Sequence, residues 1–194
     1  MKKIVFATGN PHKVEEIQAI LKGYELTSLA DIGCHEDIPE TNPTLKENAL
    51  QKARYVVENY GVKNCFAEDT GLEVDALNGE PGVYSARYAG PEKSSDTNIH
   101  KLLTKLADNP NRAAQFRTVV ALILEGKEYT FEGIIRGTIQ TKKSGFGGFG
   151  YDPVFVPEGE TRSFAEMSAT EKNKISHRAR AILLLKLFLV KENK

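Results

Sequence analysis

The sequence has few cysteines, no excess of charge of either sign and no long apolar run. Cys34 and Cys65 are too few for a disulfide framework, and their spacing does not match a zinc site. Lysine and arginine number 26, as do aspartate and glutamate, so no global positive field would hold a nucleic acid. The longest apolar stretch, 181–190, includes Lys186 and is too short to span a bilayer. We therefore expect a cytoplasmic protein with free thiols that binds neither nucleic acid nor membrane.

The pattern of apolar residues predicts an α/β fold. A length of 194 residues is enough for one domain, or for two closely apposed lobes, with a hydrophobic core. Two β-prone runs, 116–124 and 128–139, flank a turn that is typical of a hairpin. A hairpin among alternating strands and helices favours a mixed sheet over a purely parallel one. Further strands are predicted at 4–7, 24–29, 64–67 and 154–156, and helices beginning near residues 11, 44, 95, 168 and 177.

The chain begins with an apolar strand, a polar turn and an amphipathic helix. The turn contains Gly9, Asn10 and Pro11, and the apolar residues that follow recur at helical spacing. Backbone N–H groups at the start of a helix lie at the positive end of its dipole, where anions bind. Thr8 adds a hydroxyl group and Lys13 adds a cation. The segment is equally compatible with phosphate binding and with an ordinary turn.

Three acidic residues next to predicted helices and strands suggest a metal site. Glu40 lies in a loop before a helix, and Glu68 and Asp69 follow the predicted strand 64–67. Converging carboxylates need a cation, and Mg²⁺ prefers oxygen ligands and bridges substrate phosphates. Taken singly, Glu40 has the features of a solvated loop residue and Asp69 those of a turn residue.

A glycine-rich loop at 145–150 matches the spacing of glycines in the dinucleotide-binding fingerprint but lacks the structural context that the fingerprint requires. The fingerprint requires a helix after the loop, but a β-like run follows here, so a Rossmann site is excluded. The loop presents Phe149, which could stack on a base, and Asp152, which could accept hydrogen bonds from ring N–H groups. The alternative is a glycine turn with core aromatic residues.

Basic residues near the C-terminal helix form a further candidate group. His177 and Arg178 lie at a predicted helix start, where positive charge is unfavourable without an acceptor-rich partner. If one helix ran through this segment, Lys172 and Ser176 would share a face. Lys52 lies at the edge of an apolar stripe, where a surface lysine is the simpler interpretation. Together these groups describe a site for a metal ion and a nucleoside triphosphate, although each has a structural alternative.

Motifs along nearly the whole chain resemble the inosine triphosphate pyrophosphatase family. The resemblance implies one two-lobed α/β domain over residues 1–194, with an elongated mixed β-sheet flanked by helices, and a homodimer. It also implies Mg²⁺-dependent hydrolysis of ITP, dITP and XTP to the monophosphate and pyrophosphate. The motifs are Thr8–Lys13, Glu40–Ala49, Asp69–Leu72, Pro81–Arg87, Gly148–Pro153 and Ser176–Arg178.

The resemblance also implies roles for individual residues. Asp69 would accept the proton of the attacking water and, with Glu40, hold the metal ion. All other assigned residues would contact the substrate. The triphosphate would be bound by Thr8, Gly9, Asn10, Pro11, His12, Lys13 and Lys52; Thr70 would touch the substrate; Phe149, Gly150, Tyr151 and Asp152 would enclose the base; and Lys172, His177 and Arg178 would read the purine edge.

Two alternatives remain open at this stage. The chain could sense a purine nucleotide without hydrolysing it, although the presence of Glu40, Lys52 and Asp69 argues against this. It could also hydrolyse other modified or pyrimidine nucleotides, against which the purine-reading pair His177 and Arg178 argues. A nucleic-acid-binding module is the weakest alternative because no basic stripe with interleaved aromatic residues is present.

Overall fold

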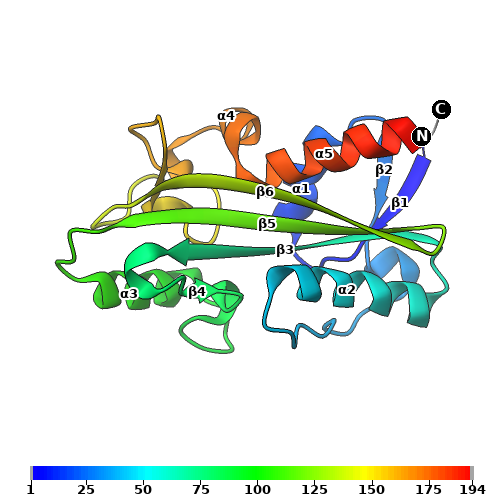
Figure 1. Ribbon diagram of the computed structural model, residues 1–194, viewed down its shortest axis with the longest axis horizontal. Coiled ribbons are helices and arrows are strands. Elements are labelled where there is room, and N and C mark those ends of the chain that lie inside the picture. The colour runs from blue at the N-terminus through cyan, green and yellow to red at the C-terminus, as the bar shows by residue number, and fades with distance from the viewer. Residues whose placement is uncertain (1, 193–194) are drawn as a thin grey trace. The chain divides into compact units, whose positions relative to one another are not determined.

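The computed structural model describes residues 2–192 and confirms an α/β fold with a mixed sheet (Figure 1). Within these residues, the strands follow the order β2-β1-β3-β5-β6-β7, and β4 pairs with β3. The β1–β2 and β1–β3 pairs are parallel, whereas the β3–β4 and β6–β7 pairs are antiparallel. The strands are β1 (Lys2–Phe6), β2 (Tyr24–Thr27), β3 (Asn64–Val74), β4 (Pro81–Gly82), β5 (Ala113–Leu124), β6 (Lys127–Ile139) and β7 (Phe155–Pro157).

The chain divides into two compact units, which are described separately. Unit 1 comprises Met1–Asp69, Thr118–Gly133 and Arg178–Lys194, and unit 2 comprises Thr70–Arg117 and Ile134–His177. Strands β3, β5 and β6 contribute residues to both units. The helices are α1 (Pro11–Ile20), α2 (Leu45–Tyr60), α3 (Ser95–Leu106), α4 (Ala169–Ile175) and α5 (His177–Glu192).

The core of unit 1 joins strands β1, β3 and β5 to helices α1 and α5. Phe6 of β1 and Phe66 of β3 stack with ring centroids 4.5 Å apart. Ile17 of α1 and Leu185 of α5 are fully buried in the same cluster. In Figure 1, α5 (red) and α2 (cyan) lie on opposite sides of the strands of this unit. The predicted burial of the C-terminal helix holds for one face only, because four apolar residues on α5 are exposed: Leu183, Leu184, Leu187 and Val190.

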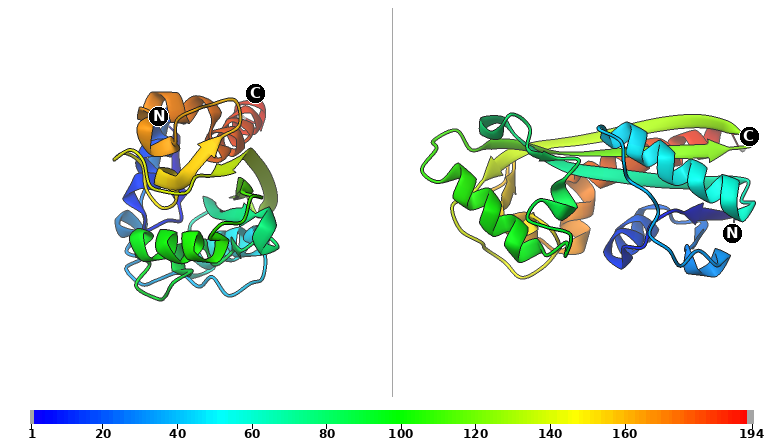
Figure 2. Two further views of the ribbon diagram at one scale, coloured as in Figure 1. Left: turned by 90° about the vertical axis from the view of Figure 1, so that its left-hand side faces the viewer. Right: turned by 90° about the horizontal axis from the view of Figure 1, so that it is seen from below.

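The core of unit 2 contains α3, the parts of β3, β5 and β6 that belong to this unit, and the segment 164–167 before α4. Helix α3 lies beside the short turn Ser85–Arg87 (Figures 1 and 2). The Ser85 hydroxyl donates to the Gly82 carbonyl oxygen and accepts a hydrogen bond from the Leu72 N–H. Among the described residues, no helix combines the length and the hydropathy that crossing a membrane requires.

Strand β3 differs from its prediction in a way that affects the site. The predicted strand ends at Ala67, but the observed strand continues to Val74. The extension is stabilised by pairing with β4 and by complete burial of Leu72 and Val74. Glu68 and Asp69 therefore lie within a buried strand, and not at its end. Alternation along a strand directs their side chains to opposite faces of the sheet.

Side-chain caps fix where the helices begin. The Thr44 side chain accepts from the Glu47 N–H at the start of α2, and Ser168 and Glu171 form a capping box at the start of α4. Ser176 is extended, with φ −64° and ψ 155°, so α4 and α5 are separate helices. The helix is therefore not continuous, and the condition under which Lys172 and Ser176 would share a helical face is not met.

Candidate active site

Unit 1 contains a cluster of two carboxylates and one lysine, the Glu40–Lys52–Asp69 cluster. The Lys52 Nζ lies 2.5 Å from Glu40 Oε1 and 3.2 Å from Asp69 Oδ1. Lys52 is only 6% exposed, which contradicts its interpretation as a surface lysine. Burial opposes the charged form of Lys52, but the negative charges of Asp69 and Glu40 raise its pKa above the ordinary value. The cluster thus joins two carboxylates to one lysine with a formal net charge of −1, with Lys52 and Asp69 buried and Glu40 partly exposed.

The loop that carries Glu40 is attached to α2 by side-chain hydrogen bonds. Gln51 Oε1 accepts from the Thr41 N–H at 3.0 Å, and its Nε2 donates to the Thr41 hydroxyl at 2.9 Å. Asn48 Oδ1 accepts from the Asn42 N–H at 2.8 Å. Asn48 and Lys52 are one helical turn apart on α2, so both side chains face the loop. These contacts hold Glu40 next to Lys52.

Two buried polar atoms on these elements are unsatisfied. Within residues 2–192, neither Asp69 Oδ2 nor Asn48 Nδ2 has a hydrogen-bond partner. Burial of unpaired polar atoms is unfavourable, which points to a ligand, ion or water at this place. Burial, together with the Glu40 charge, also raises the pKa of Asp69 despite the opposing effect of Lys52.

The carboxylates of this cluster fit a magnesium ion that is shared with a substrate. Among residues 2–192, no group of three or more His, Cys, Asp or Glu side chains is placed to hold a metal ion. Mg²⁺ commonly binds one or two carboxylates and completes its coordination with water and substrate phosphates. Glu40 and Asp69, with its unpaired oxygen, supply such a partial ligand set.

Glu68 belongs to a second buried cluster in unit 1. Its carboxylate accepts from Arg178 Nε at 2.8 Å and Arg178 Nη2 at 3.1 Å, and pairs with Lys13 Nζ at 2.8 Å. Arg178 Nη1 also donates to Glu16 at 2.6 Å. Burial disfavours the ionised carboxylate, but Arg178 and Lys13 hold the pKa of Glu68 well below its ordinary range. Because both of its oxygens are engaged here, Glu68 does not join Glu40 and Asp69.

The N-terminal turn places its polar groups around the start of α1. Asn10 caps this helix, because its side chain accepts from the His12 N–H at 3.0 Å. The Asn10 N–H donates to the Thr8 hydroxyl at 3.2 Å. Pro11 is the first residue of the helix, as expected for this position. The turn therefore has the predicted strand-to-helix geometry, and Lys13 extends from it to Glu68.

Unit 2 contains the aromatic and basic residues of the candidate base site. Lys172 Nζ lies 2.6 Å from Asp152 Oδ2, which also accepts from the Phe149 N–H at 2.8 Å. The same ammonium group lies 4.8 Å from the Phe149 ring centroid, a cation–π distance. Gly148 has a φ of +71°, and a Cβ there would meet Asp152 Oδ2 at 2.1 Å, so only glycine fits. The glycine-rich loop thereby fixes Phe149, Asp152 and Lys172 together.

Other predicted substrate residues of unit 2 have structural contacts. The Tyr151 hydroxyl donates to the Ser85 carbonyl oxygen at 2.9 Å and is buried. The His177 ring stacks on Phe116, with centroids 4.5 Å apart and an angle of 16° between the planes. Gly150 has a φ of +62°, and Thr70 is half-buried on β3. The Tyr151 hydroxyl is therefore engaged by a contact within the protein.

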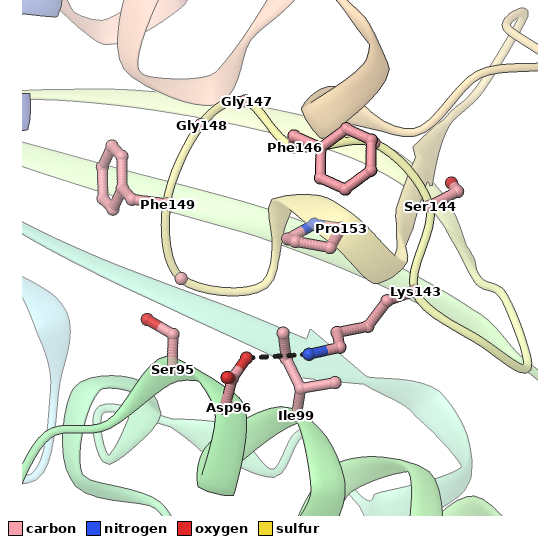
Figure 3. A pocket seen from close by; sticks show the side chains of 12 residues that line it. Ser95, Asp96, Ile99, Lys143, Ser144, Phe146, Gly147, Gly148, Phe149 and Pro153 are labelled. Carbon is pink, nitrogen blue, oxygen red and sulfur yellow. Dashed lines mark hydrogen bonds and ion pairs between the residues drawn. The ribbon is translucent and has the colours of Figure 1, made fainter.

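A cavity of about 590 Å³ lies on one side of the glycine-rich loop. Figure 3 shows Phe149 and Phe146 on the loop, with Ser95, Asp96 and Ile99 of α3 along the opposite wall. An ion pair joins Lys143 to Asp96 at 2.9 Å. The Phe146 side chain is fully exposed.

Several residues that support the site were missed from the sequence. Glu16 could have been found, because it lies three residues after Lys13 and so on the same face of α1. The contacts of Gln51 and Phe116 could not be predicted from the sequence, because their partners are distant in the chain or on another element.

The comparisons with known proteins identify the family. The Ham1 family model matches residues 4–188, so the chain belongs to the Ham1 family. It is 56% identical over 192 residues to a dITP/XTP pyrophosphatase of Porphyromonas gingivalis, covering 98% of each chain. It is 55% identical over 181 residues to a Flavobacterium johnsoniae protein of the same name, covering 93% of this chain and 94% of that one.

Solved structures agree with this membership. The Ham1 protein of Staphylococcus aureus superposes with a TM-score of 0.89 at 41% identity, covering 98% of this chain and 100% of that chain. A nucleoside-triphosphatase, or dITP/XTP pyrophosphatase, of Mycobacterium abscessus superposes with a TM-score of 0.77 at 44% identity, covering 94% and 98%. The predicted fold class is confirmed by these neighbours.

Proposed function

We propose that this chain is a Mg²⁺-dependent pyrophosphatase that converts dITP, XTP and ITP to the monophosphate and pyrophosphate. The observation that carries the proposal is the Glu40–Lys52–Asp69 cluster with the unpaired, buried Asp69 Oδ2. The relatives named as dITP/XTP pyrophosphatases support the substrate class. The direct test is pyrophosphate release from dITP by the purified protein, with Mg²⁺ and after its removal by a chelator.

Glu40 and Asp69 are the residues that would hold the metal ion. A bound Mg²⁺ would neutralise phosphate charge and orient the anhydride for attack by water. Asp69 would accept the proton of that water, and its buried Oδ2 has no hydrogen-bond partner among the described residues. Water would then attack the α-phosphorus, and the bond from this atom to the bridging oxygen would break, releasing pyrophosphate.

We assign triphosphate binding to the cationic and backbone groups of unit 1. The segment 8–13 presents the start of α1, where the dipole favours anions, and Lys13 is held beside it by Glu68. Lys52 adds a second cation on α2. We assign Thr70, the first residue of unit 2, to substrate contact.

We assign recognition of the base to one aromatic and three basic residues, of which all but Arg178 belong to unit 2. Phe149 would stack on the purine, with Lys172, His177 and the adjacent Arg178 reading its edge. Hypoxanthine and xanthine carry a carbonyl acceptor at the six-position, whereas adenine carries an amine donor. A donor that binds this carbonyl would be left unpaired by ATP, at a cost of roughly 1–3 kcal/mol. The buried Lys172 ammonium group beside the half-buried Phe149 ring supports this assignment.

The substitution Phe149→Ala is expected to weaken binding of a dITP analogue by about 1–3 kcal/mol, because base stacking on an aromatic ring has that magnitude. Titration calorimetry measures the change. Phe146→Ala is the matched control, since Phe146 lies on the same loop but is fully exposed, and its affinity should equal that of the parent chain. Equal affinities of the two variants would remove Phe149 from base binding.

We further propose that the chain is a homodimer, as its resemblance to the family implies, and that it acts in the cytoplasm, as its composition led us to expect. Light scattering of the purified protein tests the dimer. A single species at the mass of one chain, 21.5 kDa, would contradict it.

A further inference from the structure

Lys52 stands between the two carboxylates that are proposed to hold the metal ion. Its ammonium group contacts one oxygen of each, at 2.5 Å from Glu40 and 3.2 Å from Asp69. All three groups are at least largely buried, so solvent screens these contacts weakly. A divalent cation that binds both carboxylates competes with Lys52 for their negative charge, even if it binds Asp69 through Oδ2, which Lys52 does not contact.

We propose that Lys52 is an exchangeable counter-ion that excludes a free divalent cation until a nucleotide arrives, an inference that rests on the proposed function. In the nucleotide-free protein, Lys52 neutralises one of the two carboxylate charges. A triphosphate brings several negative charges, which attract the ammonium group away from the carboxylates. The metal ion then takes its place, and Lys52 pairs with phosphate.

The small number of protein ligands supports this exchange. Within residues 2–192, no third acidic, histidine or cysteine side chain completes a metal site with Glu40 and Asp69. The two carboxylates and Lys52 together carry one net negative charge. They therefore attract a hydrated cation only weakly. Phosphate oxygens are needed both as additional ligands and as a new partner for Lys52. Metal binding is therefore coupled to nucleotide binding by one side chain.

The flexible stem of lysine suits such a movement, and the surroundings of Lys52 stay fixed. The loop backbone beside Glu40 is held by the contacts of Thr41 and Asn42 with Gln51 and Asn48, so this backbone keeps its place when Lys52 leaves. Asp69 lies within the central strand β3. Lysine has four rotatable carbon–carbon bonds and a compact charge, unlike the rigid fork of arginine.

The test is the affinity for Mn²⁺ alone, followed by the free-ion electron paramagnetic resonance signal. Lys52→Met is expected to bind Mn²⁺ at least about tenfold more tightly than the parent chain without nucleotide, because removal of the ammonium leaves two uncompensated carboxylates. Lys105→Met is the control, since Lys105 also pairs with a carboxylate, Glu80, but lies in unit 2 and has no role in the proposed site. Its Mn²⁺ affinity should equal that of the parent chain. The double variant Lys52→Met/Glu40→Gln should lose the gain.

The outcomes separate this inference from the proposed function. In the parent chain, Mn²⁺ should bind tightly once an ITP analogue with a methylene group between the α- and β-phosphorus atoms is added. If Mn²⁺ fails to bind even then, the proposed metal site itself is wrong. If Mn²⁺ binds with the analogue, but Lys52→Met binds Mn²⁺ alone no better than the parent chain, the counter-ion role is wrong.

A second measurement covers the case in which Lys52→Met is unstable without metal. Its thermal unfolding midpoint should rise with Mn²⁺ more than that of the parent chain, and equal rises would contradict the proposal. If the variant does not fold at all, the ammonium resonance of Lys52 in the parent chain serves instead. This resonance should be unchanged by millimolar Mg²⁺ alone and shift when Mg²⁺ and the analogue are both present. A shift with Mg²⁺ alone would overturn the exchange.

Discussion

Replacement of Asp69 by asparagine is expected to lower kcat for dITP by at least about two orders of magnitude, the scale of losing a general base. The amide cannot accept the proton of the attacking water, although it has nearly the same shape as the carboxylate. Folding should be preserved, because Lys52 keeps its ion pair with Glu40. Steady-state kinetics of pyrophosphate release, with circular dichroism of the same preparations, measures both effects.

The matched control for this variant is Asp108→Asn. Asp108 is an exposed aspartate after α3, so its replacement should leave kcat and KM unchanged. Turnover of Asp69→Asn close to that of the control would show that Asp69 takes no part in the chemistry. A loss that appears only as a higher KM would assign Asp69 to binding instead of proton transfer.

The substitution Arg178→Met is expected to lower the free energy of unfolding by about 3–5 kcal/mol, the usual cost of removing one partner from a buried ion pair. Among the described residues, it leaves the buried Glu68 carboxylate with Lys13 as its remaining ion-pair partner. Urea unfolding followed by circular dichroism measures the loss. Arg54→Met is the matched control, because the Arg54–Glu128 pair has a similar 2.7 Å contact but is exposed. The control should cost less than about 1 kcal/mol.

Equal losses in the two arginine variants would show that the Glu68 cluster contributes no more than a surface pair. If Arg178→Met does not fold, the double variant Arg178→Met/Glu68→Leu provides the test. Replacing a buried ion pair by apolar residues of similar size is often neutral, so the double variant should recover part of the loss. A double variant less stable than the single one would contradict the account.

The same cluster predicts how stability depends on pH. The pKa of Glu68 is lower in the folded chain than the value of about 4.3 expected after unfolding. Its ion pairs therefore stabilise the fold fully above that unfolded value, and the contribution is lost as the pH falls below it. The difference in unfolding free energy between the parent chain and Arg178→Met should accordingly be constant from pH 7 to about pH 5 and shrink as the pH is lowered further. A difference that stays constant below about pH 5 would exclude titration of Glu68 as its source.

The sequence predicted local structure well where the signal was itself local. Thr44 and Ser168 were recognised as helix starts because their capping partners lie three residues away. The prediction that the glycine-rich loop is not a Rossmann site is confirmed, since the loop leads through a short turn to β7 and not to a helix. The mixed sheet followed from the hairpin.

The sequence predicted less well what depends on distant partners. The end of β3 was placed at Ala67 because Glu68 and Asp69 look like turn residues, but buried cations allow both carboxylates inside the strand. Lys52 looked like a surface residue for the same reason, since its two carboxylate partners are 12 and 17 residues away. Ion pairs between residues that are distant in the chain produce no periodic pattern in the sequence.

The roles of individual site residues were implied by family resemblance. The structure places Phe149, Asp152 and Lys172 in contact within unit 2, and Lys13, Glu68 and Arg178 in contact within unit 1. The assignment of Arg178 to the purine edge stays a prediction, because its guanidinium is bound here by Glu68 and Glu16.

The most direct test of the account is release of pyrophosphate and monophosphate from dITP, XTP, ITP, GTP and ATP by the purified protein, with and without Mg²⁺. We expect Mg²⁺-dependent turnover of the first three, and turnover of ATP at least about tenfold slower, as one unpaired buried donor would cause. Equal turnover of ATP would contradict recognition of the six-position. Absence of turnover by folded protein that still binds dITP would contradict the enzyme and favour a nucleotide sensor.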